Sequence, residues 1–210
     1  MEQIPRNDDI SSVIRSEKTL LPIEIIRELV ANAIIHQDLS QTGFAPRVEI
    51  FSNRIEISNA GEPLIEPQRF IDTNKSRNDR LAYYMRKYGL CEEKGSGIDR
   101  VVKIAELMQL PPPSFETRPG QTVVKIGGYK SFSDLNTVER MMACYQHCCL
   151  KYVLSEHMTN ETLRKRFGVD GSKSSSVSHV IRACIEADLV KPDELSGGAK
   201  RSARYKPIWA

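Results

Sequence analysis

The stretch Arg27–Asp38, RELVANAIIHQD, indicates the fold through its order with two glycine motifs that follow it. Apolar residues recur around it with helical spacing, and they predict a helix packed through Ile23, Ile26, Val30, Ala33 and Ile34, with Pro22 in its first turn. Glu28 and Asn32 lie four residues apart and His36 follows four later, so the three side chains share one face. That face is either a solvated helix edge or part of a polar site, and the spacing alone favours the solvated edge.

The composition places the chain in a broad class. It has 210 residues, enough for one large or two small domains, and 40% hydrophobic and 27% charged residues are typical of globular proteins. No apolar run is long enough to cross a bilayer, and the polar N-terminus has no apolar signal core. We therefore expect a cytoplasmic protein without membrane contact, whose five cysteines are reduced thiols.

The charge is unevenly distributed along the chain. Residues 1–136 hold 18 Lys and Arg against 19 Asp and Glu, whereas residues 137–210 hold 12 against 8. The last 15 residues contain four basic residues and no acidic one. This asymmetry indicates a polyanion-binding module in the second part of the chain.

Periodicity and breakers predict the remaining elements. RVEIFSNRIEIS at 47–58 predicts a β-hairpin that turns at Ser52-Asn53, with Val48, Ile50, Ile55 and Ile57 facing inward. Helices are expected over 79–90 and 95–110, the second ended by the prolines at 111–113, and another hairpin over 114–128. Three more helices are expected at about 136–155, 160–167 and 173–187. We place a polar segment at 1–18, one domain at 19–130, a linker at 131–136 and a second domain at 137–210.

Two glycine motifs follow the Glu28/Asn32 helix. ISNAGEP places Asn59 and Gly61 directly after a buried strand, and KGSGIDRV places Gly95 and Gly97 at a helix start. Glycines there let the backbone approach an anion, and free N–H groups of a first helical turn bind phosphate. Each motif alone would be a plain glycine loop.

Taken together and in this order, the motifs resemble the three conserved boxes of the GHKL ATPase superfamily. The closer similarity is to short GHKL-like domains of RecG-related proteins and transcriptional regulators, and it covers residues about 19–128. The resemblance implies an α+β chain, in which a Bergerat-type GHKL α/β sandwich is followed by a small winged-helix domain. Members often carry a further N-terminal domain, so the chain is compatible with a C-terminal fragment of a longer protein.

The resemblance also implies roles for individual residues. Glu28 corresponds to the general base that activates water, and Asn32 to the asparagine that holds Mg²⁺ against the phosphates of ATP. The remaining nucleotide-binding positions are Asn59 and Gly61 at the adenine, Lys75 and Arg77 in the lid-like segment, and Gly95, Ser96 and Gly97 in the phosphate loop. Lys75 and Arg77 are equally compatible with a solvated loop, and we interpret His36 as a structural residue near a helix end.

Two departures from the family pattern concern the adenine side. Asn59 replaces the usual aspartate, which removes an anionic acceptor, and Pro63 stands where a second glycine is common. The lid segment is also short. These departures concern the contacts with ATP and its turnover, and they leave the implied fold unchanged.

The second domain has the pattern of a winged helix-turn-helix. TNETLRKRFGV at 159–169 offers Asn160 as an N-cap, Leu163 and Phe167 as an apolar pair, and Gly168 as a helix stop. The next helix would bury Val177, Val180, Ile181, Cys184 and Ile185. We expect its exposed face and a basic wing to bind duplex DNA through Lys173, Ser175, Ser178, His179, Arg182, Lys200, Arg201 and Arg204. A winged-helix domain can instead bind another protein. The sequence leaves open whether this domain forms a homodimer.

These observations lead to one functional hypothesis and one alternative. The hypothesis is an ATP- and Mg²⁺-binding transcriptional regulator, at most a weak ATPase, in which nucleotide binding modulates DNA binding. The alternative is a degenerate GHKL-like scaffold that binds no nucleotide and serves as a DNA-binding or interaction module. Helicase activity is not expected, because the sequence has no G-x-x-x-x-G-K-[ST] loop. ACYQHCC at 143–149 favours an apolar helix with buried thiols over a zinc site.

Overall fold

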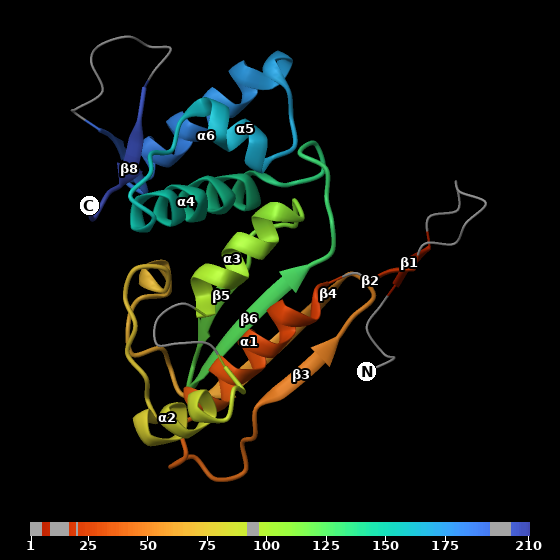
Figure 1. Cartoon of the computed structure of the whole chain (residues 1–210), viewed down its shortest axis with the longest axis vertical. Helices are drawn as coiled ribbons and strands as arrows, with labels where there is room; N and C mark the ends of the chain where they lie inside the picture. Colours follow the sequence, from red (N-terminus) through yellow and green to blue (C-terminus); the bar gives the residue numbers. More distant parts are fainter. Residues whose placement is uncertain (1–5, 9–16, 20, 92–96, 194–202) are drawn as a thin grey trace. The chain divides into compact units, whose positions relative to one another are not determined.

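A computed structural model describes residues 6–8, 17–19, 21–91, 97–193 and 203–210 (Figure 1). The chain is a mixed α+β protein with an antiparallel sheet. It divides into two compact units, of which the first comprises Met1–Val101 and Pro113–Tyr129, and the second Val102–Pro112 and Lys130–Ala210. The second half of the 97–107 helix thus groups with the C-terminal unit, whereas the boundary expected from the sequence keeps this helix in the 19–130 domain. Within the described residues, no helix is both long and apolar enough to cross a membrane.

The first unit combines a four-stranded sheet with helices. The sheet has the order β3-β4-β6-β5, and every neighbouring pair is antiparallel. Its elements are β3 (Arg47–Ile50), β4 (Arg54–Ala60), β5 (Ser114–Arg118), β6 (Gln121–Gly127), α1 (Ile23–Ile35), the 3-10 helix η1 (Pro67–Arg69), α2 (Asp79–Lys87) and the start of α3 (Gly97–Leu107). A separate short pair is formed by β1 (Arg6–Asp8) and β2 (Glu17–Thr19). Both predicted hairpins are present, and Gly120 turns the second one with a φ of +69°.

The two faces of the sheet differ in chemistry. Directly opposite residues share a face, so Ile55 pairs with Ile126 and Ile57 with Val124 on the face that carries the core. On the other face, Nε of Arg54 lies 2.7 Å from Oε1 of Glu56, and Nζ of Lys125 lies 2.6 Å from Oε1 of Glu116. The sheet therefore buries its aliphatic rows and carries ion pairs on its opposite side.

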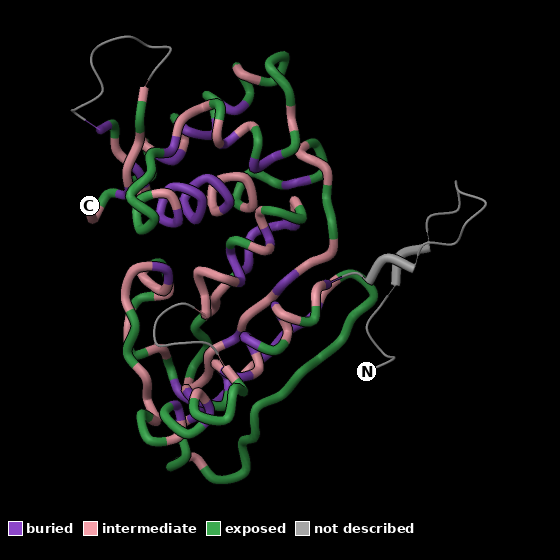
Figure 2. Tube along the Cα trace, viewed as in Figure 1, coloured by how far each residue is buried: buried purple, intermediate pink, exposed green. Residues whose placement is uncertain are grey.

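Val48 and Ile50 on β3 face the same side as Ile57 and Ile55, as predicted. They nevertheless remain 45% and 44% exposed, because β3 is an edge strand. The predicted packing face of α1 is shifted. Ile23 and Ile34 are exposed, whereas the buried residues of the helix are Ile25, Glu28, Leu29, Ala31, Ala33 and Ile35 (Figure 2).

Besides the end of α3, the described part of the second unit contains the helices α4, α5 and α6, followed by an antiparallel pair of strands. Its elements are α4 (Thr137–Val153), α5 (Asn160–Arg166), the 3-10 helix η2 (Gly171–Lys173), α6 (Ser174–Glu186), β7 (Val190–Pro192) and β8 (Tyr205–Pro207). Capping boxes start α4 at Asn136 and α5 at Thr159, so the predicted N-cap of α5, Asn160, is wrong by one residue. Asn160 instead donates from Nδ2 to the carbonyl of Ser174 at 3.0 Å and to Oγ of Ser178 at 2.9 Å, which joins α5 to α6.

A buried polar cluster holds the end of α3 within this unit. His147, on α4, has its Nδ1 3.0 Å from Oε2 of Glu106 and its Nε2 3.1 Å from Oγ1 of Thr162. Arg166 is 5% exposed and donates to the carbonyl of Leu110 at 2.7 Å, with Nε 3.8 Å from Oε1 of Glu106. Burial lowers the pKa of Arg166, against the opposing charge of Glu106. His147 therefore belongs to a polar contact between helices, and within the described residues no three His, Cys, Asp or Glu side chains gather as metal ligands.

Candidate functional site

A pocket of about 140 Å³ lies in the first unit, between the helices and the core face of the sheet. α1 contributes Glu28, Asn32 and His36 along one face, as helical spacing requires. The sheet contributes Ile57 and Asn59 from β4, Phe115 from β5, and Thr122 and Val124 from β6. The segment between β4 and α2 contributes Glu62, Pro63, Leu64, Ile65, Phe70, Thr73, Asn74, Lys75, Ser76 and Arg77.

The polar end of the pocket is formed by α1 and the first turn of α3. Glu28 is 2% exposed, and a Cβ added to Gly97 would lie 2.8 Å from its Oε2 and 3.5 Å from Nδ2 of Asn32. A side chain at this point of α3 would require the carboxylate of Glu28 to shift. Nδ2 of Asn32 is buried and has no hydrogen-bond partner within the described ranges. Glu28, Asn32 and Gly97 therefore lie together at this end of the pocket. Gly95 and Ser96 lie outside the described residues.

The opposite end of the pocket is formed by Asn59 and its neighbours. Asn59 is 6% exposed, and its Nδ2 donates to the carbonyls of His36 at 3.2 Å and Ala60 at 2.9 Å. Because both partners are carbonyl oxygens, the amide nitrogen must face them, and the carboxamide oxygen is the group that a ligand can use. Thr122 is paired with Asn59 across the β4–β6 ladder and also lines the pocket.

Gly61 supports the site through the backbone. Its φ is +100°, and an added Cβ would lie 3.0 Å from Cβ of Asp38 and 3.1 Å from Cζ of Arg77. Its N–H donates to the carbonyl of Gly120 at 2.8 Å, and its own carbonyl accepts from Oγ1 of Thr122 at 2.7 Å. Gly61 thus shapes the loop after β4, and it is not among the residues that line the pocket.

The two predicted cations of the lid-like segment differ in their surroundings. Arg77 donates from Nε to the carbonyl of His36 at 3.1 Å and from Nη2 to that of Glu62 at 2.6 Å. Its guanidinium therefore fastens the end of α1 to the loop after β4. Lys75 is exposed and lines the pocket, so its ammonium group is the more available charge for an anion.

Several residues that hold the site together were not singled out from the sequence. Nδ2 of Asn78 donates to the carbonyls of Ile35 at 2.9 Å and Gln37 at 2.7 Å, which caps the C-terminal end of α1. Oε1 of Gln37 accepts from the backbone N–H of Ala60 at 2.9 Å. The polar tripeptide His36-Gln37-Asp38 directly after an apolar helix was the available signal, because buried backbone groups at a helix end need such partners.

The titratable groups around the pocket have shifted pKa values. Burial, followed by the charge of Arg77, lowers the pKa of His36, which keeps the imidazole neutral at pH 7. Hydrogen bonds from Ser40 and Gln41 lower the pKa of Asp38 to about 2. Burial, followed by the charge of Asp72, raises the pKa of Asp99 in the first turn of α3 to about 6.

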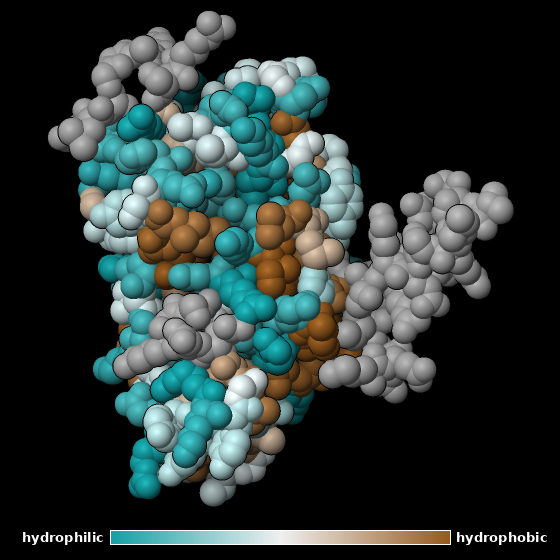
Figure 3. Space-filling view, viewed as in Figure 1, coloured by the Kyte–Doolittle hydropathy of each residue, from teal (hydrophilic) through white to brown (hydrophobic). Residues whose placement is uncertain are grey.

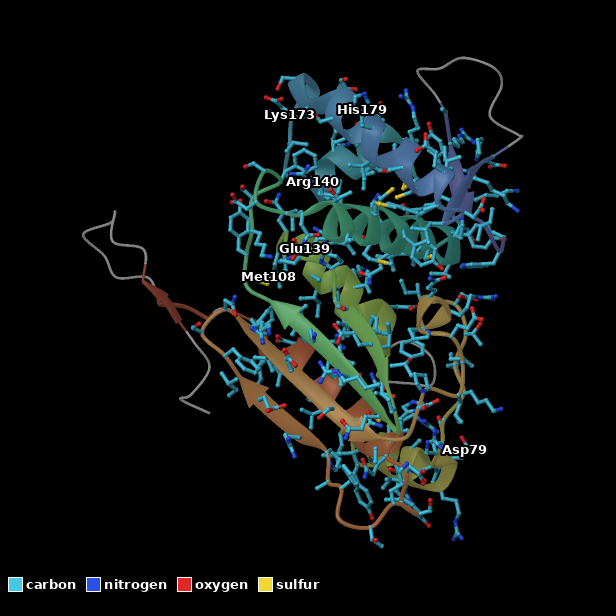
Figure 4. The ribbon with its side chains drawn as sticks, turned by 180° about the vertical axis from the view of Figure 1, so that it is seen from behind. Asp79, Met108, Glu139, Arg140, Lys173 and His179 are labelled. Atoms are coloured by element: carbon cyan, nitrogen blue, oxygen red, sulfur yellow. The ribbon has the colours of Figure 1, made fainter. Side chains whose placement is uncertain are left out.

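The residues predicted to bind DNA lie in the second unit. Lys173, Ser175, Ser178, His179 and Arg182 are all exposed. Figure 4 shows Lys173 at the start of α6 and His179 farther along it. Arg204, just before β8, is exposed, whereas Lys200 and Arg201 lie outside the described residues. The surface of α5 and α6 is mainly hydrophilic in the view of Figure 3.

Comparison with known proteins gives a family and similarity to solved structures, of which one is described below. Residues 43–126, less than half of the chain, match the family described as "Putative ATP-dependent DNA helicase recG C-terminal". This match supports an ATPase-type domain of the nucleotide-binding class. It includes Asn59, Gly61, Lys75, Arg77 and the 95–97 loop, whereas Glu28 and Asn32 precede it.

The structural similarity is to the DIP2311 protein from Corynebacterium diphtheriae, with a TM-score of 0.54 and 18% sequence identity. The alignment covers 86% of this chain and 38% of that one, so this chain spans little more than a third of the length of that protein. At this identity the similarity concerns the fold alone. No curated protein matches the chain.

Proposed function

We propose that this chain is a nucleotide-responsive, DNA-binding regulator with a GHKL-type nucleotide pocket in its first unit. The observation that carries the proposal is the convergence of Glu28, Asn32 and Gly97, because it joins a carboxylate, a carboxamide and a helix N-terminus at one end of a pocket. The N-terminus of α3 provides N–H groups and a partial positive charge for phosphates. The family similarity of residues 43–126 supports the same class of ligand.

The residues present fit a magnesium nucleotide. A carboxylate and a carboxamide oxygen are the hard ligands that Mg²⁺ prefers. Nδ2 of Asn32 has no hydrogen-bond partner among the described residues, so this N–H group can donate to a phosphate oxygen. Asn32 would hold the ion and Lys75 would meet phosphate oxygens, while Asn59 would accept from the adenine amino group through its carboxamide oxygen. When bound, Mg²⁺ would supply positive charge that balances these phosphates.

Glu28 is positioned for the proton transfer of a weak ATPase. Its carboxylate lies in the pocket against Gly97, within one helical turn of Asn32 on the same face. A carboxylate in this place can orient a water and accept its proton. Burial lowers the pKa of His36, and its backbone carbonyl accepts from Asn59 and Arg77, so we assign this residue a structural role.

We also propose that the second unit is a winged helix that binds duplex DNA. Three helices followed by an antiparallel hairpin have the required order. Ser175, Ser178, His179 and Arg182 occupy one face of α6 and are exposed, as the residues of a recognition helix must be. The excess of basic residues over 137–210 supports contact with phosphates.

The nucleotide proposal is tested by isothermal titration of ATP with Mg²⁺ into the whole chain. We expect saturable binding that falls at least tenfold in Asn32→Ala, because both the ion and the phosphates lose a partner. Asn53→Ala is a matched control, since Asn53 is exposed and lies in the β3–β4 turn. Binding by Asn32→Ala that equals the parent refutes the proposal.

The DNA proposal is tested by fluorescence anisotropy with a labelled duplex at several salt concentrations. The logarithm of affinity should fall linearly with the logarithm of salt, by about 0.9 for each phosphate neutralised. Arg182→Ala should weaken DNA binding and make the affinity less dependent on salt. Lys103→Ala, which replaces an exposed lysine on α3, should change neither quantity. Equal binding by both variants contradicts the assignment of α6.

A second function, a scaffold without nucleotide, is favoured by two observations. Asn59 offers a neutral acceptor, with its Nδ2 occupied by two carbonyls, and Arg77 is committed to backbone carbonyls. This alternative predicts no heat of ATP binding together with duplex DNA binding that ATP does not change.

A further inference from the structure

The outer face of α2 carries an unusual combination of side chains. Tyr83, Tyr84 and Tyr88 are 56%, 48% and 72% exposed, and Arg80 and Lys87 are exposed beside them. At about 100° per residue, these five side chains fall within an arc of about 140° on one side of the helix. We call Arg80, Tyr83, Tyr84, Lys87 and Tyr88 the α2 aromatic face.

The fold does not need these tyrosines. α2 is attached through its other side, where Ala82 and Met85 join a buried cluster with Ala31 and Ile35. Tyr83 and Tyr84 contact each other edge-on, with ring centroids 5.3 Å apart, and remain about half exposed. Single exposed apolar residues are common, but three aromatic rings gathered with two cations indicate a binding surface.

The chemistry of this face selects its ligand. Within α2, Arg80, Arg86 and Lys87 outnumber the single acid, Asp79, so the helix attracts anions. Successive rings offer flat surfaces to nucleobases, and neighbouring cations can neutralise the phosphates between them, which is how single strands are held without sequence preference. Tyr84 and Tyr88 lie about 6 Å apart along the helix axis, close to the roughly 7 Å that two stacking steps occupy.

We propose that the α2 aromatic face binds single-stranded nucleic acid, with bases stacked on Tyr84 and Tyr88 and phosphates near Arg80 and Lys87. A single strand fits this surface better than a duplex, whose bases are already stacked on both sides and would have to be pulled apart. In Figure 3, the part of the first unit where Figure 1 places α2 is mostly teal to white. This surface is distinct from the proposed duplex-binding face of α6.

The experiment is fluorescence anisotropy of the whole chain with labelled oligo(dT), oligo(U) and a duplex. We expect both single strands to bind, and Tyr84→Ala and Tyr88→Ala each to weaken them about tenfold. Tyr84→Phe and Tyr88→Phe should retain binding, because the ring is kept. Tyr129→Ala, which removes a 61% exposed tyrosine elsewhere in the first unit, should have no effect. Preference between oligo(dT) and oligo(U) identifies the strand as DNA or RNA.

The outcomes separate this proposal from the proposed function. Loss of single-strand binding in the alanine variants, with ATP binding and duplex binding unchanged, supports the α2 aromatic face. If the parent binds no single strand, or if the double variant Tyr84→Ala/Tyr88→Ala binds as the parent does, the proposal is overturned. If Arg182→Ala abolishes single-strand binding instead, the strand binds on α6, and the proposal for the α2 aromatic face is also overturned.

Discussion

Replacing Gly61 by alanine should destabilise the first unit for two separable reasons. The φ of +100° is unfavourable for an L-residue, which costs about 1–3 kcal/mol, partly offset by about 0.4–1 kcal/mol through the unfolded chain. The new Cβ would also lie 3.0 Å from Cβ of Asp38 and 3.1 Å from Cζ of Arg77. Forcing neighbours apart in a packed site costs a further amount of about 1–3 kcal/mol.

A matched control isolates the steric part. Gly43 has a φ of +84°, and an added Cβ there meets no atom within 4 Å. Gly43→Ala therefore carries the backbone cost alone, and Gly61→Ala should be less stable than Gly43→Ala by about 1–3 kcal/mol. In an Arg77→Ala background the cost of Gly61→Ala should fall, because one of the two crowded neighbours is gone, while Asp38 still prevents full relief.

The assay is urea unfolding followed by far-UV circular dichroism. The single tryptophan, Trp209, lies in the second unit, where its Nε1 donates to the hydroxyl of Tyr145 at 3.1 Å. The fluorescence of Trp209 therefore follows the unfolding of the second unit. Its urea midpoint should be the same in Gly61→Ala as in the parent protein. Equal stability of Gly61→Ala and Gly43→Ala would refute the packing described around Gly61.

Three further outcomes follow from the described contacts. Glu106→Ala should lower the stability of the second unit by about 3 kcal/mol, measured by Trp209 fluorescence in urea, because Arg166 stays buried after losing its carboxylate. Thr159→Ala should cost about 1 kcal/mol in the same measurement, because the capping box of α5 is lost. Asp99→Asn should raise the melting temperature at pH 8 and leave it unchanged at pH 4. The folded pKa of Asp99, about 6, is above its ordinary value of 3.8, so its ionisation destabilises the fold progressively as pH rises through this interval.

Periodicity and breakers predicted most of the elements because the relevant signals are local. The prolines at 111–113 and the Pro119-Gly120 turn fall where α3 and the β5–β6 hairpin require them. Of the residues to which the two glycine motifs and the Glu28/Asn32 spacing pointed, Glu28, Asn32, Asn59 and Gly97 line one pocket.

The errors arise where the outcome depends on tertiary partners. α1 has apolar residues on nearly every side, so local spacing could not decide between Ile34 and Ile35 as the buried one. Val48 and Ile50 alternate correctly, but alternation cannot show that β3 is an edge strand. The bonds from Asn78 to the end of α1 join residues more than forty positions apart, which no local pattern specifies.

The cysteines have a practical consequence. Cys144, Cys148, Cys149 and Cys184 are buried in the second unit, and burial raises the pKa of Cys148. Cys91 is only half-buried and lines the pocket of the first unit. Because alkylation requires an accessible thiolate, a maleimide reagent should modify the native protein first at Cys91. The unmodified sequence therefore carries its own attachment point for a probe, and the rate of labelling can report whether the pocket is occupied.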